Sequence, residues 1–121
     1  MSTTIILFAH GARDPGWAAP VHELAVRLHK AGVRAEPAFL EHMQPDLESA
    51  VDALASDGVT DILIAPLFLA QGSHLKRDLP AQLEAMKLKH PGLGFRVAPA
   101  LGEDEAVLGA IVRSLLARLD P

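Results

Sequence analysis

The feature that most constrains the fold is a fourfold alternation of short apolar runs with segments whose apolar residues recur at helical spacing. The apolar runs span residues 4–9, 33–40, 61–68 and 94–98. Continuous apolar runs of this length are typical of strands buried on both faces. Strict alternation of strand and helix favours parallel strands joined by right-handed crossovers. We therefore predict an α/β fold in which a β-α unit is repeated four times to give a single four-stranded parallel sheet flanked by helices.

An apolar stripe at helical spacing follows each predicted strand. In chain order, the stripes are Val21, Leu24, Ala25 and Leu28; Leu47, Ala50, Val51 and Leu54; Leu79, Leu83 and Met86; and Leu108, Ile111, Leu115 and Leu119. Pro20 near the start and Gly32 at the end of the first stripe are typical helix boundaries. Pro37 lies in the second predicted strand and has no backbone N–H, so we expect that strand at an edge of the sheet.

Composition limits the class of protein. The chain has 121 residues, half of them apolar and 21% charged, which is typical of one globular domain over residues 1–121. The absence of cysteine excludes disulfides and thiolate metal sites. A net charge of -4 without a basic stripe argues against a nucleic-acid partner. No apolar run approaches the roughly 18 residues of a membrane span, and no signal-peptide pattern precedes the first strand. We expect a cytoplasmic protein with no membrane partner.

Polar side chains follow three of the predicted strands. His10 comes directly after the first strand, Glu41 after the second, and His74 a few residues after the third, in the loop. They are 31 and 33 residues apart, about one β-α unit each. Because ligands bind at the carboxyl ends of the strands in open parallel sheets, we expect the three side chains to converge there.

Two imidazoles and a carboxylate without a thiolate suit iron, cobalt, nickel or zinc at intermediate affinity. Three protein ligands leave coordination positions open, so such a site can activate a bound molecule or release the metal. Each residue alone also has an ordinary explanation, because loop histidines are commonly solvated and a carboxylate before a helix commonly serves the helix dipole. We interpret the other histidines as follows: His22 and His29 on a helix surface, His90 near a helix C-terminus, and His42 as an exposed or supporting neighbour of Glu41.

Four segments carry a resemblance to a known family. They are HGARDP after the first predicted strand, FLE at the end of the second, PLFLAQGSHLKRDLP around the third, and APALGEDEAVL near the end of the chain. Together they resemble the short sirohydrochlorin chelatases, which are ATP-independent class II tetrapyrrole chelatases. The resemblance implies a chelatase-like fold, a homodimer, and insertion of a divalent metal into the octacarboxylate tetrapyrrole sirohydrochlorin on the way to cobalamin or sirohaem. The metal is a substrate, with Co²⁺ favoured over Fe²⁺ or Ni²⁺, and no organic cofactor or ATP is implied.

The resemblance also implies roles for individual residues. His10 and His74 match the two family histidines that serve as general base and metal ligands, and Glu41 matches the family glutamate, a catalytic and substrate-binding residue. The segment that contacts the macrocycle matches Leu69, Ala70, Gln71, Gly72 and Ser73, followed by His74. Ala12 stands where the family often has serine, which removes one hydroxyl contact.

The chemistry agrees with these roles. Metallation expels two pyrrole N–H protons, so a base must lie near the incoming metal. An imidazole can bind a metal or accept a proton near neutral pH, but one nitrogen cannot do both at once. His10 and His74 therefore alternate or divide these tasks. Arg13, Lys76 and Arg77 lie in the same loops and are either contacts for the substrate carboxylates or solvated charges. A glycine at position 72 permits the close backbone approach that a flat macrocycle needs.

Two other functions fit parts of the pattern. Ala9-His10-Gly11 resembles the Arg-His-Gly start of the histidine phosphatases, but alanine at the arginine position removes the main cation for phosphate, and the chain is short for that class. A non-catalytic carrier of metal or tetrapyrrole would use the same ligands without base catalysis. Turnover distinguishes the carrier from the enzyme.

Overall fold

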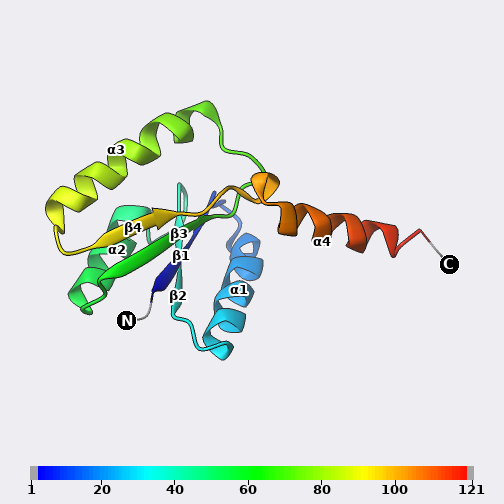
Figure 1. Cartoon of the computed structure of the whole chain (residues 1–121), viewed down its shortest axis with the longest axis horizontal. Helices are drawn as coiled ribbons and strands as arrows, with labels where there is room; N and C mark the ends of the chain where they lie inside the picture. Colours follow the sequence, from blue (N-terminus) through cyan, green and yellow to red (C-terminus); the bar gives the residue numbers. More distant parts are fainter. Residues whose placement is uncertain (1–2, 120–121) are drawn as a thin grey trace.

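The computed structural model describes residues 3–119, except for the side chain of His74. One sheet contains β1 (Thr4–Ala9), β2 (Ala35–Phe39), β3 (Asp61–Pro66) and β4 (Gly94–Val97), in the order β2-β1-β3-β4. Every neighbouring pair is parallel. The helices are α1 (Ala19–Lys30), α2 (Leu47–Ser56), α3 (Ser73–Lys89) and α4 (Glu105–Leu116), with the short 3-10 helices η1 (Pro15–Ala18) and η2 (Leu101–Glu103). The predicted α/β fold with four parallel strands is confirmed (Figure 1).

The strand order agrees with the position of proline in the sequence. The strand with Pro37, β2, lies at an edge of the sheet, as predicted, and β1 lies between β2 and β3. α1 covers one face of the sheet, and α2 and α3 cover the other (Figure 1). In the part of the chain that the structure describes, no helix is long and apolar enough to cross a lipid bilayer.

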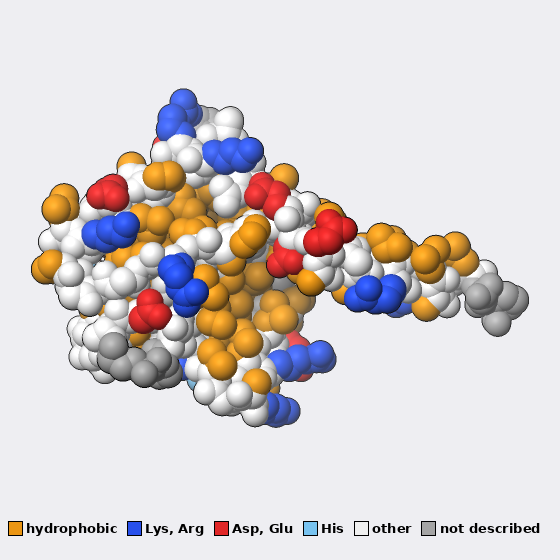
Figure 2. All heavy atoms as spheres, viewed as in Figure 1, with side chains coloured by type: hydrophobic (Ala, Val, Ile, Leu, Met, Phe, Trp, Pro, Cys, Tyr) orange, Lys and Arg blue, Asp and Glu red, His pale blue; other side chains and the backbone are white. Residues whose placement is uncertain are grey.

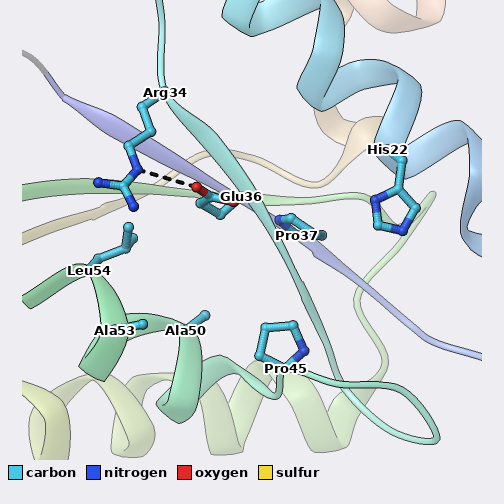
Figure 3. Close-up of a pocket in the computed structure, with 8 residues that line it drawn as sticks. All are labelled: His22, Arg34, Glu36, Pro37, Pro45, Ala50, Ala53 and Leu54. Carbon is cyan, nitrogen blue, oxygen red and sulfur yellow. Dashed lines mark hydrogen bonds and ion pairs between the residues drawn. The ribbon is translucent and has the colours of Figure 1, made fainter. Parts of the chain in front are cut away.

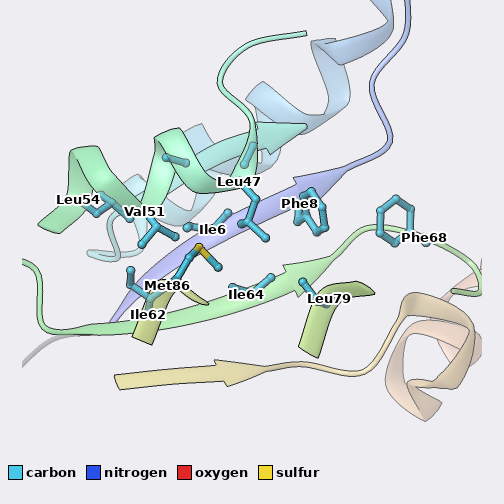
Figure 4. Close-up of a cluster of buried hydrophobic side chains, with 12 residues drawn as sticks. Ile6, Phe8, Leu47, Val51, Leu54, Ile62, Ile64, Phe68, Leu79 and Met86 are labelled. Carbon is cyan, nitrogen blue, oxygen red and sulfur yellow. The ribbon is translucent and has the colours of Figure 1, made fainter. Parts of the chain in front are cut away.

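The larger hydrophobic core lies between the sheet and the two helices α2 and α3 (Figure 4). Ile6 and Phe8 of β1 point into it, whereas Leu7 and Ala9 point to the side of α1. β1 is therefore buried on both faces, which explains its continuous apolar run. Because both faces of β1 are buried, the end of the strand is held in place. This fixes the backbone position of the next residue, His10, at the edge of the sheet.

β3 is less completely covered than β1. Ile62 and Ile64 are fully buried on the face of α2 and α3, whereas Leu63 and Ala65 on the opposite face are only half-buried. On that face α1 packs against β1 and β2. A strand inside a parallel sheet is ordinarily covered on both faces, so among residues 3–119 this half of the sheet lacks a covering helix.

α4 projects away from the sheet instead of packing on it (Figure 1). No residue of α4 is buried. The exposed fractions of its apolar side chains rise from 37% at Leu108 to 60% at Leu115, and Leu119 just beyond the helix is 76% exposed. Figure 2 shows hydrophobic atoms along α4 and also between the strands and α1. One chain thus leaves both an apolar helix face and half of an apolar sheet face uncovered.

Asp46 caps the N-terminus of α2, because its Oδ1 accepts a hydrogen bond from the backbone N–H of Ser49 at 2.8 Å. This bond lowers the pKa of the Asp46 carboxyl below its ordinary value. A carboxyl with a lowered folded-state pKa stabilises the fold above its ordinary pKa, and this stability is lost as the pH falls through the folded-state pKa.

We expect Asp46→Ala to lower the free energy of unfolding by about 1 kcal/mol at neutral pH. The difference from wild type should shrink as the pH falls from about 4, the ordinary pKa of aspartate, through the lower pKa of the carboxyl in the folded state. Urea unfolding at about pH 7 and about pH 3 measures both effects. An equal difference at the two pH values would contradict a cap that depends on charge.

Candidate active site

His10 is the first residue beyond β1, at the carboxyl edge of the sheet. Two backbone hydrogen bonds extend the pairing of β1 with β2 past the strand ends: Leu40 N–H donates to Ala9 at 2.9 Å and Glu41 N–H donates to His10 at 3.1 Å. The chain after β2 therefore runs beside His10. It brings Oε1 of Glu41 to 3.6 Å from Nδ1 of His10, with the two side chains 58% and 52% exposed, respectively. An imidazole and a carboxylate thus lie together where a ligand can reach them.

An aromatic contact holds the other side of the His10 ring. The imidazole lies edge-to-face on Phe68, with ring centroids 5.7 Å apart and planes at 88°. Phe68 makes a similar contact with Phe8 in the core, at 5.7 Å and 77° (Figure 4). Such contacts stabilise by about 0.5–1.5 kcal/mol each and favour one ring orientation. Sequence analysis did not identify Phe68 as a site residue; its only signal was an aromatic side chain at the end of an apolar run that precedes the loop.

Gly11 allows the first two loops to approach each other. Its φ is +88°, and a β-carbon at this position would lie 1.9 Å from the backbone carbonyl oxygen of Glu41. A left-handed backbone and a contact this close both require glycine. The glycine after His10 is therefore part of what brings Glu41 to the histidine.

A cavity of about 160 Å³ opens beside His10. It is lined by His10, Leu40, Phe68, Ala70, Gly72 and Leu75. Of the segment predicted to contact a macrocycle, Ala70 and Gly72 line this cavity, Leu69 and Ser73 are exposed, and Gln71 is half-buried. Pockets for small molecules usually enclose about 300–1,000 Å³. This cavity therefore accommodates the edge of a large ligand, not the whole of it.

His74 is the second residue of α3, whereas the sequence placed it in the preceding loop. It stands in the chain between Gly72 and Leu75, both of which line the cavity. Its side chain lies outside the described residues, so its predicted role stays a prediction. Among the side chains that are described, no group of three His, Asp or Glu residues is placed to hold a metal ion. The predicted cations Arg13, Lys76 and Arg77 are all exposed.

His22, His29 and His90 do not line the cavity beside His10. His22 and His29 are exposed on α1, as predicted, and Nε2 of His29 lies 3.1 Å from the carbonyl oxygen of Ala35. His90 lies at the C-terminus of α3, as predicted. In addition, its Nε2 lies 2.7 Å from Oδ1 of Asp52, so it joins the end of α3 to α2, and this contact lowers the pKa of the Asp52 carboxyl.

A larger cavity, of about 490 Å³, lies at the outer edge of β2 between α1 and α2 (Figure 3). Its lining residues are His22, Arg34, Glu36, Pro37, Pro45, Ala50, Ala53 and Leu54. The guanidinium of Arg34 is paired with Glu36 at 3.3 Å and with Asp57 at 2.7 Å. Because this cation is already neutralised and no predicted site residue lines the cavity, it is not the candidate active site.

Comparison with known proteins gives a consistent result. The CbiX family model matches residues 4–117. The sirohydrochlorin cobaltochelatase of Sulfurisphaera tokodaii is 36% identical over 103 residues, which cover 85% of this chain and 82% of that protein. A crystal structure named as a cobalamin (vitamin B12) biosynthesis CbiX protein, from Marinobacter aquaeolei VT8, matches with a TM-score of 0.81 at 33% identity, over 96% of this chain and 95% of that one.

A longer protein contains the same fold. The sirohydrochlorin chelatase SirB from Bacillus subtilis subspecies spizizenii, solved in complex with cobalt, matches 97% of this chain with a TM-score of 0.73 at 27% identity. The match covers 51% of the SirB chain. The resemblance found in the four sequence segments is therefore confirmed over almost the whole chain.

Proposed function

Because the chain belongs to the CbiX family, we propose that it is a metal chelatase that inserts a divalent ion, with Co²⁺ preferred, into sirohydrochlorin without ATP. The observation that carries the proposal is the contact between His10 and Glu41 at the carboxyl edge of the sheet. Imidazole and carboxylate ligands suit Co²⁺, Fe²⁺ and Ni²⁺, and without a thiolate they release the ion readily. The cobaltochelatase name of the relative at 36% identity favours cobalt among these ions.

The reaction exchanges two pyrrole protons for one metal ion, so the protein must hold the ion and accept protons close together. Nδ1 of His10 faces Glu41, so this imidazole can hold the ion together with the carboxylate, or can take a proton when no ion lies between them. The Glu41 carboxylate orients the ring and stabilises the imidazolium that forms after proton transfer. We assign the complementary task, ligand or base, to His74.

The loop cations and the exposed segment after β3 suit the rest of the substrate. The exposed side chains of Arg13 and Lys76 are available to pair with substrate carboxylates. Leu69 is 68% exposed and presents an apolar surface on which a flat ring can lie. The cavity beside His10 receives only one edge of the macrocycle, so we expect most of the substrate to lie across these loops.

Anaerobic absorbance of sirohydrochlorin with Co²⁺, Fe²⁺ or Ni²⁺, in the presence and absence of the protein, tests the proposal. We expect the protein to accelerate metallation and to form many equivalents of product for each chain. Product that stops at one equivalent would indicate a carrier and not an enzyme. No acceleration with any of the three ions would contradict the proposed function.

We also propose a homodimer in which α4 of each copy covers the open half of the other copy's sheet. The exposed apolar stripe of α4 and the half-buried face of β3 are complementary surfaces, and α4 projects away from the sheet of its own chain (Figures 1 and 2). Reciprocal exchange of one helix gives a closed two-fold dimer. η2, which precedes α4, is hydrogen-bonded to the loop between β3 and α3, because Gly102 N–H donates to the carbonyl oxygen of Leu69 at 2.8 Å. Helix exchange would therefore also brace the loop that meets the substrate.

We expect the double variant Ile111→Asp, Leu115→Asp to be monomeric, because two charges cannot be buried against an apolar sheet face. Sedimentation velocity at micromolar concentration measures the change. Ser114→Asp, which adds a charge at a polar position of the same helix, is the matched control and should stay dimeric. A wild-type protein that sediments as a monomer would rule out the dimer.

A further inference from the structure

The loop after β2 makes a strained turn at His42. The φ of His42 is +65°. Among the described residues it is the only non-glycine residue with a positive φ. Met43 N–H donates to the carbonyl of Glu41 at 2.8 Å, which closes a three-residue turn centred on His42. Glycine adopts this backbone with less strain than histidine, and strained residues concentrate at functional sites. An imidazole at this position therefore points to a use for the side chain.

The turn brings a second imidazole to the same carboxylate oxygen. Nε2 of His42 lies 3.8 Å from Oε1 of Glu41, the atom that lies 3.6 Å from Nδ1 of His10. Two ligands that bind one ion at about 2.1 Å are themselves separated by about 3.0–3.4 Å. Each of the two imidazole–carboxylate pairs can therefore close on an ion through side-chain movements of a few tenths of an ångström. The His42 side chain is 35% exposed and can be reached from solvent.

We propose that Glu41 and His42 form an outer binding position for the divalent metal, from which the ion passes to His10 through the shared carboxylate. This inference rests on the proposed function, because it assigns an entry step to the same site. In the transfer, the bond from the metal to His42 breaks as the bond to His10 forms, while Glu41 stays bound. No proton moves and the charge of the site does not change. Water completes the coordination at both positions.

A glycine at position 42 separates the role of the ring from the role of the backbone. His42→Gly relieves the strain at φ +65° and removes only the imidazole. A residue needed only for the turn should be replaced by glycine without loss. His42→Asn also tolerates the left-handed backbone but offers no imidazole nitrogen. His22→Asn, at an exposed position on α1, is the matched control for weak binding of Co²⁺ to surface histidines.

Binding of Co²⁺ alone, followed by calorimetry and visible absorption without tetrapyrrole, tests the outer position directly. In a His10→Ala background we expect a weak Co²⁺ site to remain. Adding His42→Gly or His42→Asn should weaken that site by about tenfold or more, whereas adding His22→Asn should leave it unchanged. Unchanged Co²⁺ affinity in the His42 variants would overturn the proposal, as would full retention of affinity by asparagine.

Kinetics of the otherwise wild-type protein give the second readout. We expect His42→Gly to raise the KM for Co²⁺ by about tenfold and to leave kcat within about twofold, because an entry position affects capture of the ion and not the insertion step. Urea unfolding should show this variant to be at least as stable as wild type. A KM unchanged by His42→Gly would overturn the proposal. If wild type bound Co²⁺ through His42 yet metallated no sirohydrochlorin, the proposed function would fail while the outer position stood.

Discussion

Replacing His10 with glutamine is expected to lower the initial rate of cobalt insertion into sirohydrochlorin by at least about a hundredfold, the usual effect of losing a general base. Glutamine keeps approximate size and hydrogen bonding but has no basic nitrogen. The amide also replaces an imidazole ligand, so the loss should exceed that of a base alone. The fold should be retained, because the His10 side chain is 58% exposed and packs only at the edge of the core, against Phe68.

Initial rates under anaerobic conditions, with far-ultraviolet circular dichroism as the check on folding, measure this effect. His22→Gln on α1 is the matched control, because it removes an exposed histidine that does not line the cavity beside His10. Glu41→Gln should lose less than His10→Gln, since it leaves the imidazole in place, but it should still lower the rate because it replaces the carboxylate at 3.6 Å that shares the ion. A His10→Gln protein that keeps most of the wild-type rate would show that His10 is neither base nor essential ligand.

The fold could be predicted because its signals are local and repeated. β1 and β3 are continuous apolar runs, and the helices between strands carry apolar residues at helical spacing, so alternation alone indicates a parallel sheet. Pro37 indicated the edge strand, since the missing N–H is tolerated there. The juxtaposition of His10 and Glu41 followed from topology, because the carboxyl ends of neighbouring parallel strands lie at one edge.

What could not be predicted depends on contacts between distant residues. The apolar stripe of α4 shows that the helix needs a partner surface, but periodicity does not say which surface covers it. The start of α3 at Ser73 has no side-chain cap, so the sequence carries no signal there and His74 was assigned to a loop. The left-handed backbone of His42 and the packing of Phe68 on His10 likewise have no local signature beyond residue type.

Gly11 is the position where a single methyl group should be most damaging. Its φ of +88° alone disfavours alanine, and the added β-carbon would also meet the Glu41 carbonyl oxygen at 1.9 Å. Gly32, just after α1, has the same φ of +88° but no atom within 4 Å of the β-carbon position. The pair Gly11→Ala and Gly32→Ala therefore separates the cost of the left-handed backbone from the cost of the close approach.

We expect Gly32→Ala to lower the free energy of unfolding by about 1–2 kcal/mol, the cost of a left-handed alanine. Gly11→Ala should lose about 1–3 kcal/mol more, because the chain between β2 and α2 must move away from the added carbon. That movement carries Glu41 away from His10, so the insertion rate should fall by about tenfold or more while the protein is still folded. Urea unfolding and initial rates measure the two effects separately. Equal losses of stability in the two variants, with insertion unchanged in Gly11→Ala, would mean that the approach of Glu41 to Gly11 does not determine the geometry of the site.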